Sequence, residues 1–342
     1  MDKIWTWEVR DPGADILFVT NMYPDSERPA YGIFVKRQIE SLRRRGLKCD
    51  VLYIRGYQGF HTYMLGALQL AAGSIIWRRR YRLIHAHAGE SGMIARFMVG
   101  IPVLTSYCGD DLQGHYREDG TISRAQRLRR WVIQQHTRLC SATITKSSEM
   151  EGLIPTGNRG RNHVVPNGVD TSQFKPRDRA ETRSRLGWKD DGYVVLFAAT
   201  RPYEVRKRLS LAEQAIEIAA AQVGPIRLHI AENVAPDEVP LLMSASDCLL
   251  LTSRMEGSPN VVKEALMSDL PVVSTRVGDV DELLSGVEPS AACSDDPNEL
   301  GNAVASILSK GGPSNGRTLK AHLSDTAIAE RLEAIYFDLA SR

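Results

Sequence analysis

Short apolar runs alternate with segments of helical spacing along most of this chain, and this alternation limits the possible fold more than any other feature. The first half predicts strands at 15–20, 49–54, 83–87 and 102–106 and helices at 32–45, 62–80 and 91–99. The second half predicts strands at 193–199, 226–230, 248–252 and 271–275 and helices at 208–222, 237–246 and 259–268. Such alternation is typical of parallel βαβ units. We therefore predict an α/β chain with two Rossmann-like domains, whose ligands bind beyond the carboxyl ends of the strands.

The composition suits a globular protein of this kind. The 342 residues are 43% hydrophobic and 25% charged, and the length fits two domains of ordinary size. The five cysteines are scattered and form no CxxC pair, which predicts a reducing compartment and no structural zinc. The opening residues do not resemble a secretory signal, and no run approaches the ~20 apolar residues that span a bilayer. We therefore expect a cytoplasmic protein.

Charge is distributed unevenly along the chain. The net charge is +2, but residues 1–165 carry +9 and residues 166–342 carry −7. The basic half predicts contact with an anionic surface or acceptor. Peripheral contact with the inner membrane surface is therefore an open alternative. Nucleic-acid binding is disfavoured, because the isoelectric point is only 8.2 and no nucleic-acid module is visible.

Two glutamates, Glu256 and Glu264, lie eight residues apart around a turn that opens the predicted helix 259–268. Ser258 is expected as the N-cap and Pro259 as the first helical residue. Free N–H groups at a helix start bind anions. Glu256 is expected at the mouth of this site, and Glu264 about two turns in, at roughly 3.6 residues per turn. By itself the pair fits a capped acidic helix equally well.

Two cations follow the strand at 193–199. Arg201 and Lys207 can hold a diphosphate, Arg as a bidentate donor and Lys as a point charge. The alternative is a solvated basic loop. Arg206 and Arg208 are expected to be surface residues.

Together, these residues resemble the motifs of retaining, nucleotide-sugar-dependent glycosyltransferases of family 4, which have the GT-B fold. The resemblance implies two Rossmann-like domains whose parallel sheets face across a cleft. It also implies a metal-independent, hexosyltransferase-like enzyme without a cofactor, whose donor substrate is a nucleoside diphosphate sugar. In that family the Arg and Lys bind the diphosphate, the first glutamate contacts the donor sugar and the second holds the ribose. The resemblance thus predicts catalytic roles for Arg201, Lys207 and Glu256, and donor binding by these three with Gly32, Gly257, Ser258, Asn260, Val261 and Glu264.

Other segments extend the resemblance to the rest of the chain. The Val165–Pro176 segment is similar to the family's interdomain signature, which predicts domains at 1–164 and 165–325 and a final helix at 326–342 packed back on the first. The loop containing Gly32 resembles the family's first glycine loop. The His-Gly-x-Asp element corresponds to Cys108, Gly109 and Asp111, which are expected near the acceptor or the donor sugar. Cys108 takes the place of the histidine, or Tyr107 does if the alignment shifts by one residue.

Several features have structural interpretations. The Asp279-Val-Asp281 sequence is expected to be an acidic helix cap, with no metal. His85 and His87 are expected to pack inside the fold. Segments 75–82 and 127–131 place Trp beside Arg, which fits a membrane-surface anchor or a packed helix with a basic outer face. Residues 1–14 are expected to be irregular, and 310–318 to form a flexible loop.

We therefore expect a glycosyltransferase that moves a sugar to an acceptor hydroxyl in cell-surface glycan or glycolipid synthesis, on a glycan, lipid-linked or small-molecule acceptor. Two alternatives remain at this point. One is a GT-B sugar-nucleotide epimerase, and the other is a degenerate, non-catalytic nucleotide-sugar-binding protein. A nicotinamide dehydrogenase is disfavoured because no G-x-G-x-x-G sequence follows a strand.

Overall fold

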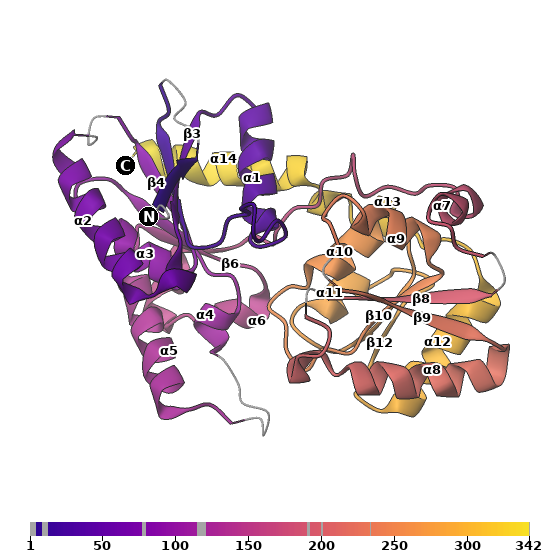
Figure 1. The fold of residues 1–342 in the computed structure, drawn as a ribbon. Helices are drawn as coiled ribbons and strands as arrows, with labels where there is room; N and C mark the ends of the chain where they lie inside the picture. The colour runs from indigo at the N-terminus through magenta and orange to yellow at the C-terminus, as the bar shows by residue number, and fades with distance from the viewer. Residues whose placement is uncertain are drawn as a thin grey trace. The chain divides into compact units, whose positions relative to one another are not determined.

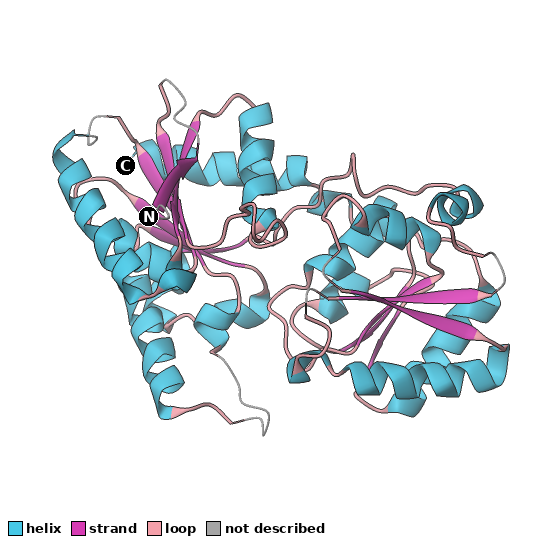
Figure 2. Ribbon diagram, in the orientation of Figure 1, coloured by secondary structure: helices cyan, strands magenta, loops and turns pink. Residues whose placement is uncertain are grey.

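The computed structural model describes residues 5–8, 13–76, 80–114, 121–189, 192–199, 201–232 and 234–341. Contacts divide the chain into two units: the first runs to Gly168 and resumes at Asp325, and the second is Val169–Ser324. Each unit contains one sheet with helices on both faces (Figures 1 and 2). The predicted α/β alternation in two Rossmann-like units is therefore confirmed.

The sheet of the first unit has the strand order β1-β3-β2-β4-β5-β6-β7. Its strands are β1 (Trp5–Glu8), β2 (Ile16–Thr20), β3 (Cys49–Ile54), β4 (Leu83–His87), β5 (Val103–Ser106), β6 (Ala142–Thr145) and β7 (Asn162–Val164). All neighbours are parallel except β1, which pairs antiparallel with β3. The expectation that residues 1–14 are irregular is thus wrong for Trp5–Glu8, which extends the sheet edge.

Two groups of helices cover this first sheet. Helices α1 and α14 lie on one face, and α2, α3 and α5 lie on the other (Figure 1). The helices of the unit are α1 (Ile33–Arg44), α2 (Phe60–Ile76), α3 (Gly89–Ala95), α4 (Asp110–Gln113), α5 (Arg124–His136), α6 (Ser148–Glu151) and α14 (Asp325–Ser341), and its 3₁₀ turns are η1 (Gly56–Gln58), η2 (Thr137–Leu139) and η3 (Thr156–Arg161).

Strand β2 shows why a continuous apolar run is needed here. Ile16 and Phe18 join the core on the α1 and α14 side, whereas Leu17 and Val19 join the core on the opposite side. Side chains alternate between the two faces of a strand, so a strand buried on both faces must be apolar throughout.

The second unit contains a wholly parallel sheet with the order β12-β11-β10-β8-β9. Its strands are β8 (Tyr193–Ala198), β9 (Ile226–Ala231), β10 (Cys248–Leu251), β11 (Val272–Thr275) and β12 (Ala291–Cys293). Its helices are α7 (Arg179–Arg185), α8 (Leu209–Val223), α9 (Val239–Ala245), α10 (Asn260–Met267), α11 (Val280–Leu284), α12 (Pro297–Lys310) and α13 (Gly316–Leu319), with 3₁₀ turns η4 (Val205–Lys207) and η5 (Ala321–Leu323).

Some predicted boundaries differ from the structure. Helix α3 begins at Gly89 rather than at residue 91. Gly89 packs close to Ile133, since an added Cβ would lie 2.7 Å from that side chain. Residues 310–318 are not simply a flexible loop, since α13 begins at Gly316 and the Arg317 guanidinium donates to the carbonyls of Phe174 and Met267. None of the helices within the described ranges has the length and hydropathy needed to cross a membrane.

Candidate functional site

The order of strands in the second unit reverses between β8 and β10. The chain continues from β8 to β9 on one side of this point and from β10 to β11 and β12 on the other. Ligands of open α/β sheets bind at such a topological switch point, beyond the carboxyl ends of the strands. Lys207 ends the η4 turn that follows β8, and Glu256 lies in the loop that follows β10. The topology therefore places these two predicted residues on the two loops that border the switch point.

Lys207 and Glu256 form an ion pair at this edge. The Lys207 Nζ donates to Glu256 Oε1 at 2.5 Å, and each side chain is 15% exposed. The Ser253 hydroxyl donates to the same carboxylate oxygen at 2.8 Å. An ammonium has three N–H donors, so Lys207 retains donors for a ligand after it has bound Glu256. The pair thus presents both charges at the strand ends.

Arg208 holds the surrounding loops together, and the expectation that it is a surface residue is wrong. Its guanidinium donates to the carbonyls of Thr252 at 2.7 Å and Ser253 at 3.2 Å, and it pairs with Asp295. The Thr252 hydroxyl in turn donates to the Lys207 carbonyl at 2.8 Å. The loops after β8, β10 and β12 are therefore joined by one side chain, which fixes the positions of Lys207 and Glu256.

Arg201 has a different setting from Lys207. Its side chain is 78% exposed, and its ion pair is with Glu204 at 3.1 Å. Glu204 also pairs with Arg206, whose side chain is 41% exposed. A diphosphate contact by Arg201 therefore remains a prediction.

Helix α10 follows Glu256 but begins one residue later than expected. Its N-cap is Pro259, and the predicted Ser258 cap is wrong, because the Ser258 hydroxyl accepts a hydrogen bond from Lys263 Nζ at 3.0 Å. The predicted donor-binding residues Gly257, Asn260, Val261 and Glu264 are all half-buried. Residues three and four apart share a helix face, so Glu264 lies one turn beyond Asn260 and Val261 on the partly open side.

Beneath this loop lies a buried charge that the sequence patterns did not predict. Lys263 is fully buried on the inner side of α10. Burial raises the pKa of nearby Asp279, and Lys263 and the Ser258 hydroxyl act in the opposite direction. Asp279 is the N-cap residue of α11 and Asp281 lies in its first turn, so the predicted acidic N-terminus of this helix is confirmed, although the Asp279 side chain makes no capping hydrogen bond. The only available signal was the position of Lys263 among apolar residues of the inner helix face.

The aspartates at 279 and 281 do not form a shared site. Asp281 is exposed and pairs with Arg276 at 2.6 Å, whereas Asp279 is buried. Within the described ranges, no group of three or more His, Cys, Asp or Glu side chains is placed to hold a metal ion.

In the first unit, Asp111 organises the loops at the carboxyl ends of β4 and β5. Its carboxylate accepts N–H groups from Gly89, Cys108, Gly109 and Leu112 at 3.0–3.2 Å. Burial, together with the charge of Glu90, raises its pKa to about 6. Asp111 thus holds the loop that carries Cys108 and Gly109.

Cys108 is a thiol rather than a thiolate at neutral pH. Burial and the neighbouring Asp111 raise its pKa to about 12. Its Sγ donates toward the Ser106 carbonyl at 3.7 Å. A neutral thiol with this orientation is a weak hydrogen-bond donor and a poor nucleophile.

Gly32 precedes α1 with φ 69°, in the left-handed region. A Cβ at this position would lie 2.3 Å from the Met22 carbonyl carbon. The close packing of its own loop therefore requires glycine, whatever else this residue contacts.

His85 and His87 lie within the fold, as their interpretation as packing residues requires. The two ring nitrogens of His85 hydrogen-bond Tyr336 at 2.6 Å and Ser106 at 2.8 Å. Burial lowers the pKa of both histidines, which keeps them neutral. Nearby Lys146, which directly follows β6, is only 3% exposed, and burial lowers its pKa. Sequence patterns did not single out Lys146, since it lies in a short polar segment.

Two family models match the chain. The model described as "Glycosyl transferase 4-like domain" matches residues 8–168, and "Glycosyl transferases group 1" matches residues 193–310. TuaC of Bacillus subtilis (strain 168), named as a teichuronic acid biosynthesis glycosyltransferase, is 22% identical over 78% of this chain and 82% of its own length. A D-inositol 3-phosphate glycosyltransferase of Catenulispora acidiphila is 25% identical over 67% of this chain, which spans only 62% of that relative.

Solved structures show the same fold. Sucrose-phosphate synthase of Thermosynechococcus elongatus matches with a TM-score of 0.76 at 17% identity, covering 96% of this chain and all of that chain. HepE of Anabaena, solved with UDP and glucose, matches with a TM-score of 0.68 at 18% identity, covering 94% of this chain and 98% of that chain. These likenesses concern the fold, and they confirm the prediction of the GT-B class.

Proposed function

The chain belongs to the GT-B glycosyltransferases, and we propose that it transfers a hexose from a UDP-sugar to an acceptor hydroxyl with retention of configuration. The observation that carries this proposal is the Lys207–Glu256 ion pair on the two loops that border the β8–β10 switch point. UDP is the proposed donor nucleotide because the HepE structure of the same fold contains UDP.

The donor is held by charge and by helix geometry. The free N–H groups of Lys207 bind the diphosphate, and N–H groups at the start of α10 bind it from the other side. Glu256 accepts hydrogen bonds from the sugar hydroxyls, and Glu264 accepts them from the ribose diol. Arg201 turns from Glu204 toward the diphosphate when the donor is bound.

In the reaction, the bond between the anomeric carbon and the diphosphate oxygen breaks, and the electron pair stays on the diphosphate. The acceptor oxygen attacks from the face that the diphosphate leaves, and its proton passes to the departing oxygen. Lys207 stabilises the negative charge that grows on this group, which is where preorganised charge lowers a barrier most. Because a lysine and a helix N-terminus supply this positive charge, we propose that no divalent metal is needed.

The acceptor is proposed to be a sugar or lipid-linked hydroxyl of a cell-surface glycan, as the name of TuaC suggests. Cys108, which stands at the position of the family histidine, can offer only a neutral thiol to a bound sugar. The reaction consumes one UDP-sugar and releases one UDP for each glycoside formed. Release of a free epimerised UDP-sugar would instead indicate an epimerase.

The test combines binding with turnover. UDP-, GDP- and ADP-sugars are first compared by thermal shift, in which a ligand that binds only the folded protein raises its transition temperature. We expect the largest rise with a UDP-sugar. Lys207→Met and Glu256→Gln should then each lower kcat/KM by about 100-fold or more. The wild-type rate should be unchanged in EDTA.

A second ion pair provides a matched control. Lys310 and Glu288 lie 3.9 Å apart with side chains 64% and 78% exposed. Lys310→Met and Glu288→Gln repeat the same chemical changes far along the sequence and should leave kcat/KM unchanged. Equal rates for all four variants would show that the Lys207–Glu256 assignment is wrong.

A further inference from the structure

Helix α2 exposes an apolar face, unlike an ordinary surface helix. None of its 17 residues is charged. Its exposed positions recur every three or four residues and carry Phe60, Met64, Leu68, Ala72 and Ile75, with His61 as the one polar side chain among them. Phe60 is 77% exposed, Leu68 66% and Ile75 89%. The outer side of a surface helix is normally polar.

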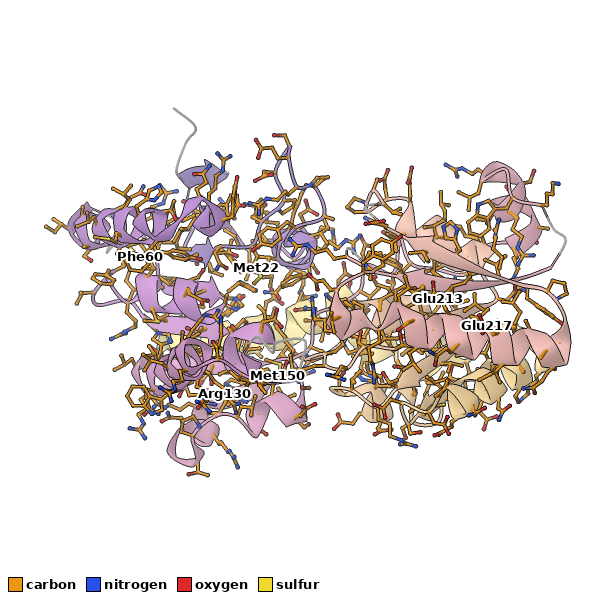
Figure 3. The ribbon with its side chains drawn as sticks, turned by 60° about the horizontal axis from the view of Figure 1, so that its bottom comes forward. Met22, Phe60, Arg130, Met150, Glu213 and Glu217 are labelled. Atoms are coloured by element: carbon orange, nitrogen blue, oxygen red, sulfur yellow. The ribbon has the colours of Figure 1, made fainter. Side chains whose placement is uncertain are left out.

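Helix α8 of the second unit shows the ordinary pattern. Its exposed positions include Glu213 and Glu217, which lie along its outer side in Figure 3. Phe60, in contrast, is the first residue of α2, is labelled beside that helix in the same view and is exposed. The apolar exposure of α2 is therefore a property of this helix and not of the whole surface.

The apolar surface continues beyond α2. The Ser74 hydroxyl donates to the Phe97 carbonyl at 3.1 Å and accepts the Val99 N–H at 2.9 Å. These bonds hold the loop after α3 against the last turn of α2, next to Ile75. Phe97 and Val99 are themselves exposed. Contiguous apolar patches of this kind mark interaction sites.

Helix α5 adds positive charge on the same side of the sheet (Figure 1). It contains four arginines and no acidic residue. Arg124, Arg127, Leu128 and Trp131 are exposed. Among the described residues, Arg129 is the one α5 arginine that pairs with α3, through Glu90. Arginines that surround exposed Leu and Trp side chains are typical of helices that lie on a membrane surface.

We propose that the side of the first unit formed by α2, the loop after α3 and α5, here called the α2–α5 face, binds the surface of a bilayer that contains anionic lipids. Its apolar side chains enter the headgroup–acyl boundary, and the α5 arginines contact lipid phosphates. A second copy of the chain fits less well. A two-fold contact through this face would bury the α5 arginines without a carboxylate to pair with them, because α2 and α5 contain no acidic residue.

The test measures binding of the full chain to vesicles, so it does not depend on the donor or the acceptor. Vesicles of phosphatidylcholine alone are compared with vesicles that also contain phosphatidylglycerol. We expect sedimentation with the anionic vesicles only, and less of it at high salt, because salt screens the headgroup charge. Equal binding to both vesicle types, or none to either, would overturn the proposal.

Substitutions on α2 and α5 test whether these helices form the membrane-binding face. Phe60→Ser and the double variant Phe60→Ser/Leu68→Ser should lower the partition coefficient, the double variant by about tenfold or more, because each removes apolar area that enters the bilayer. Arg124→Gln/Arg127→Gln should lower binding to anionic vesicles.

The control is Phe337→Ser, since Phe337 is also 77% exposed but lies on α14, on the opposite face of the sheet. It should bind vesicles as the wild type does. Circular dichroism checks that each variant is folded. A dimer in sedimentation velocity that Phe60→Ser abolishes would overturn the proposal in favour of self-association.

Discussion

Asp111 shows how one buried side chain can fix the path of two loops. Its carboxylate accepts N–H groups from the loops after β4 and β5, so it sets the path of both. Backbone N–H groups favour the ionised carboxylate, yet burial raises its pKa to about 6. Ionisation of Asp111 at neutral pH therefore lowers the free energy of unfolding, although the ionised carboxylate still accepts the loop N–H groups.

This cost has a defined pH dependence. The pKa of Asp111 rises from an ordinary value of 3.8 to about 6 on folding. The folded chain therefore holds a proton that the unfolded chain has lost between these values. The contribution of Asp111 to the free energy of unfolding is largest below about pH 4, falls as pH rises toward 6 and is constant above, with a slope of up to about 1.4 kcal/mol per pH unit.

Urea unfolding of the wild type and Asp111→Asn between pH 4 and 7 measures the difference in slope. The asparagine variant should lack this component. Asp338→Asn, a change at an exposed carboxylate of the same unit, should retain it. Parallel curves for the wild type and Asp111→Asn, or a carboxyl titration near pH 4 by NMR, would contradict the assignment.

At the scale of elements, Arg208 connects three strand ends while its own backbone is strained. It has φ 51° and ψ 53°, a left-handed conformation that costs a residue with a Cβ about 1–2 kcal/mol relative to the right-handed form. The guanidinium bonds to Thr252, Ser253 and Asp295 hold it there. Strain of this kind persists when surrounding contacts determine the conformation.

Removing the guanidinium in two ways separates the strain from the contacts. Arg208→Ala and Arg208→Gly both lose the three side-chain bonds, but only glycine adopts the left-handed conformation without cost. We expect the glycine variant to be more stable than the alanine variant by about 1 kcal/mol, although glycine is the weaker helix former. Urea unfolding decides this, and an alanine variant of equal or greater stability would show that φ relaxes.

Whether an element could be predicted from the sequence depends on how strongly apolar or periodic its own residues are. Strands such as β3 and β10 were predictable because they are long or strongly apolar. Strands β6 and β7 were not, since Ala-Thr-Ile-Thr and Asn-His-Val carry few apolar residues and their burial depends on covering helices. Within the site, Lys207 and Glu256 were singled out by their resemblance to family motifs, since their spacing alone also fits a solvated basic loop and a capped acidic helix. Arg208, Lys263 and Lys146 were not, because their burial depends on segments distant in sequence.

At the scale of the whole molecule, the C-terminal helix belongs to the N-terminal unit. The chain leaves that unit after Gly168 and returns at Asp325, and an added Cβ on Gly168 would lie 2.6 Å from the Asp325 Cα. Helix α14 then packs on α1: the Ser41 hydroxyl donates to the Asp325 carbonyl at 3.0 Å, and Leu332 shares a core with Ile39. The second unit has its own core, to which Leu266 belongs.

Two units that share no core predict two separable unfolding steps. Leu332→Ala leaves a cavity in the first unit and should destabilise it by about 2–5 kcal/mol, which lowers its transition on the order of 10 °C. Leu266→Ala should do the same to the second unit alone. Scanning calorimetry should show two transitions, with a different one shifted in each variant. Trp188 is the only one of the five tryptophans in the second unit. In a background that keeps Trp131 alone, fluorescence should follow the transition that Leu332→Ala lowers, and in one that keeps Trp188 alone it should follow the other. A single transition shifted equally by both variants would mean that the two units unfold as one.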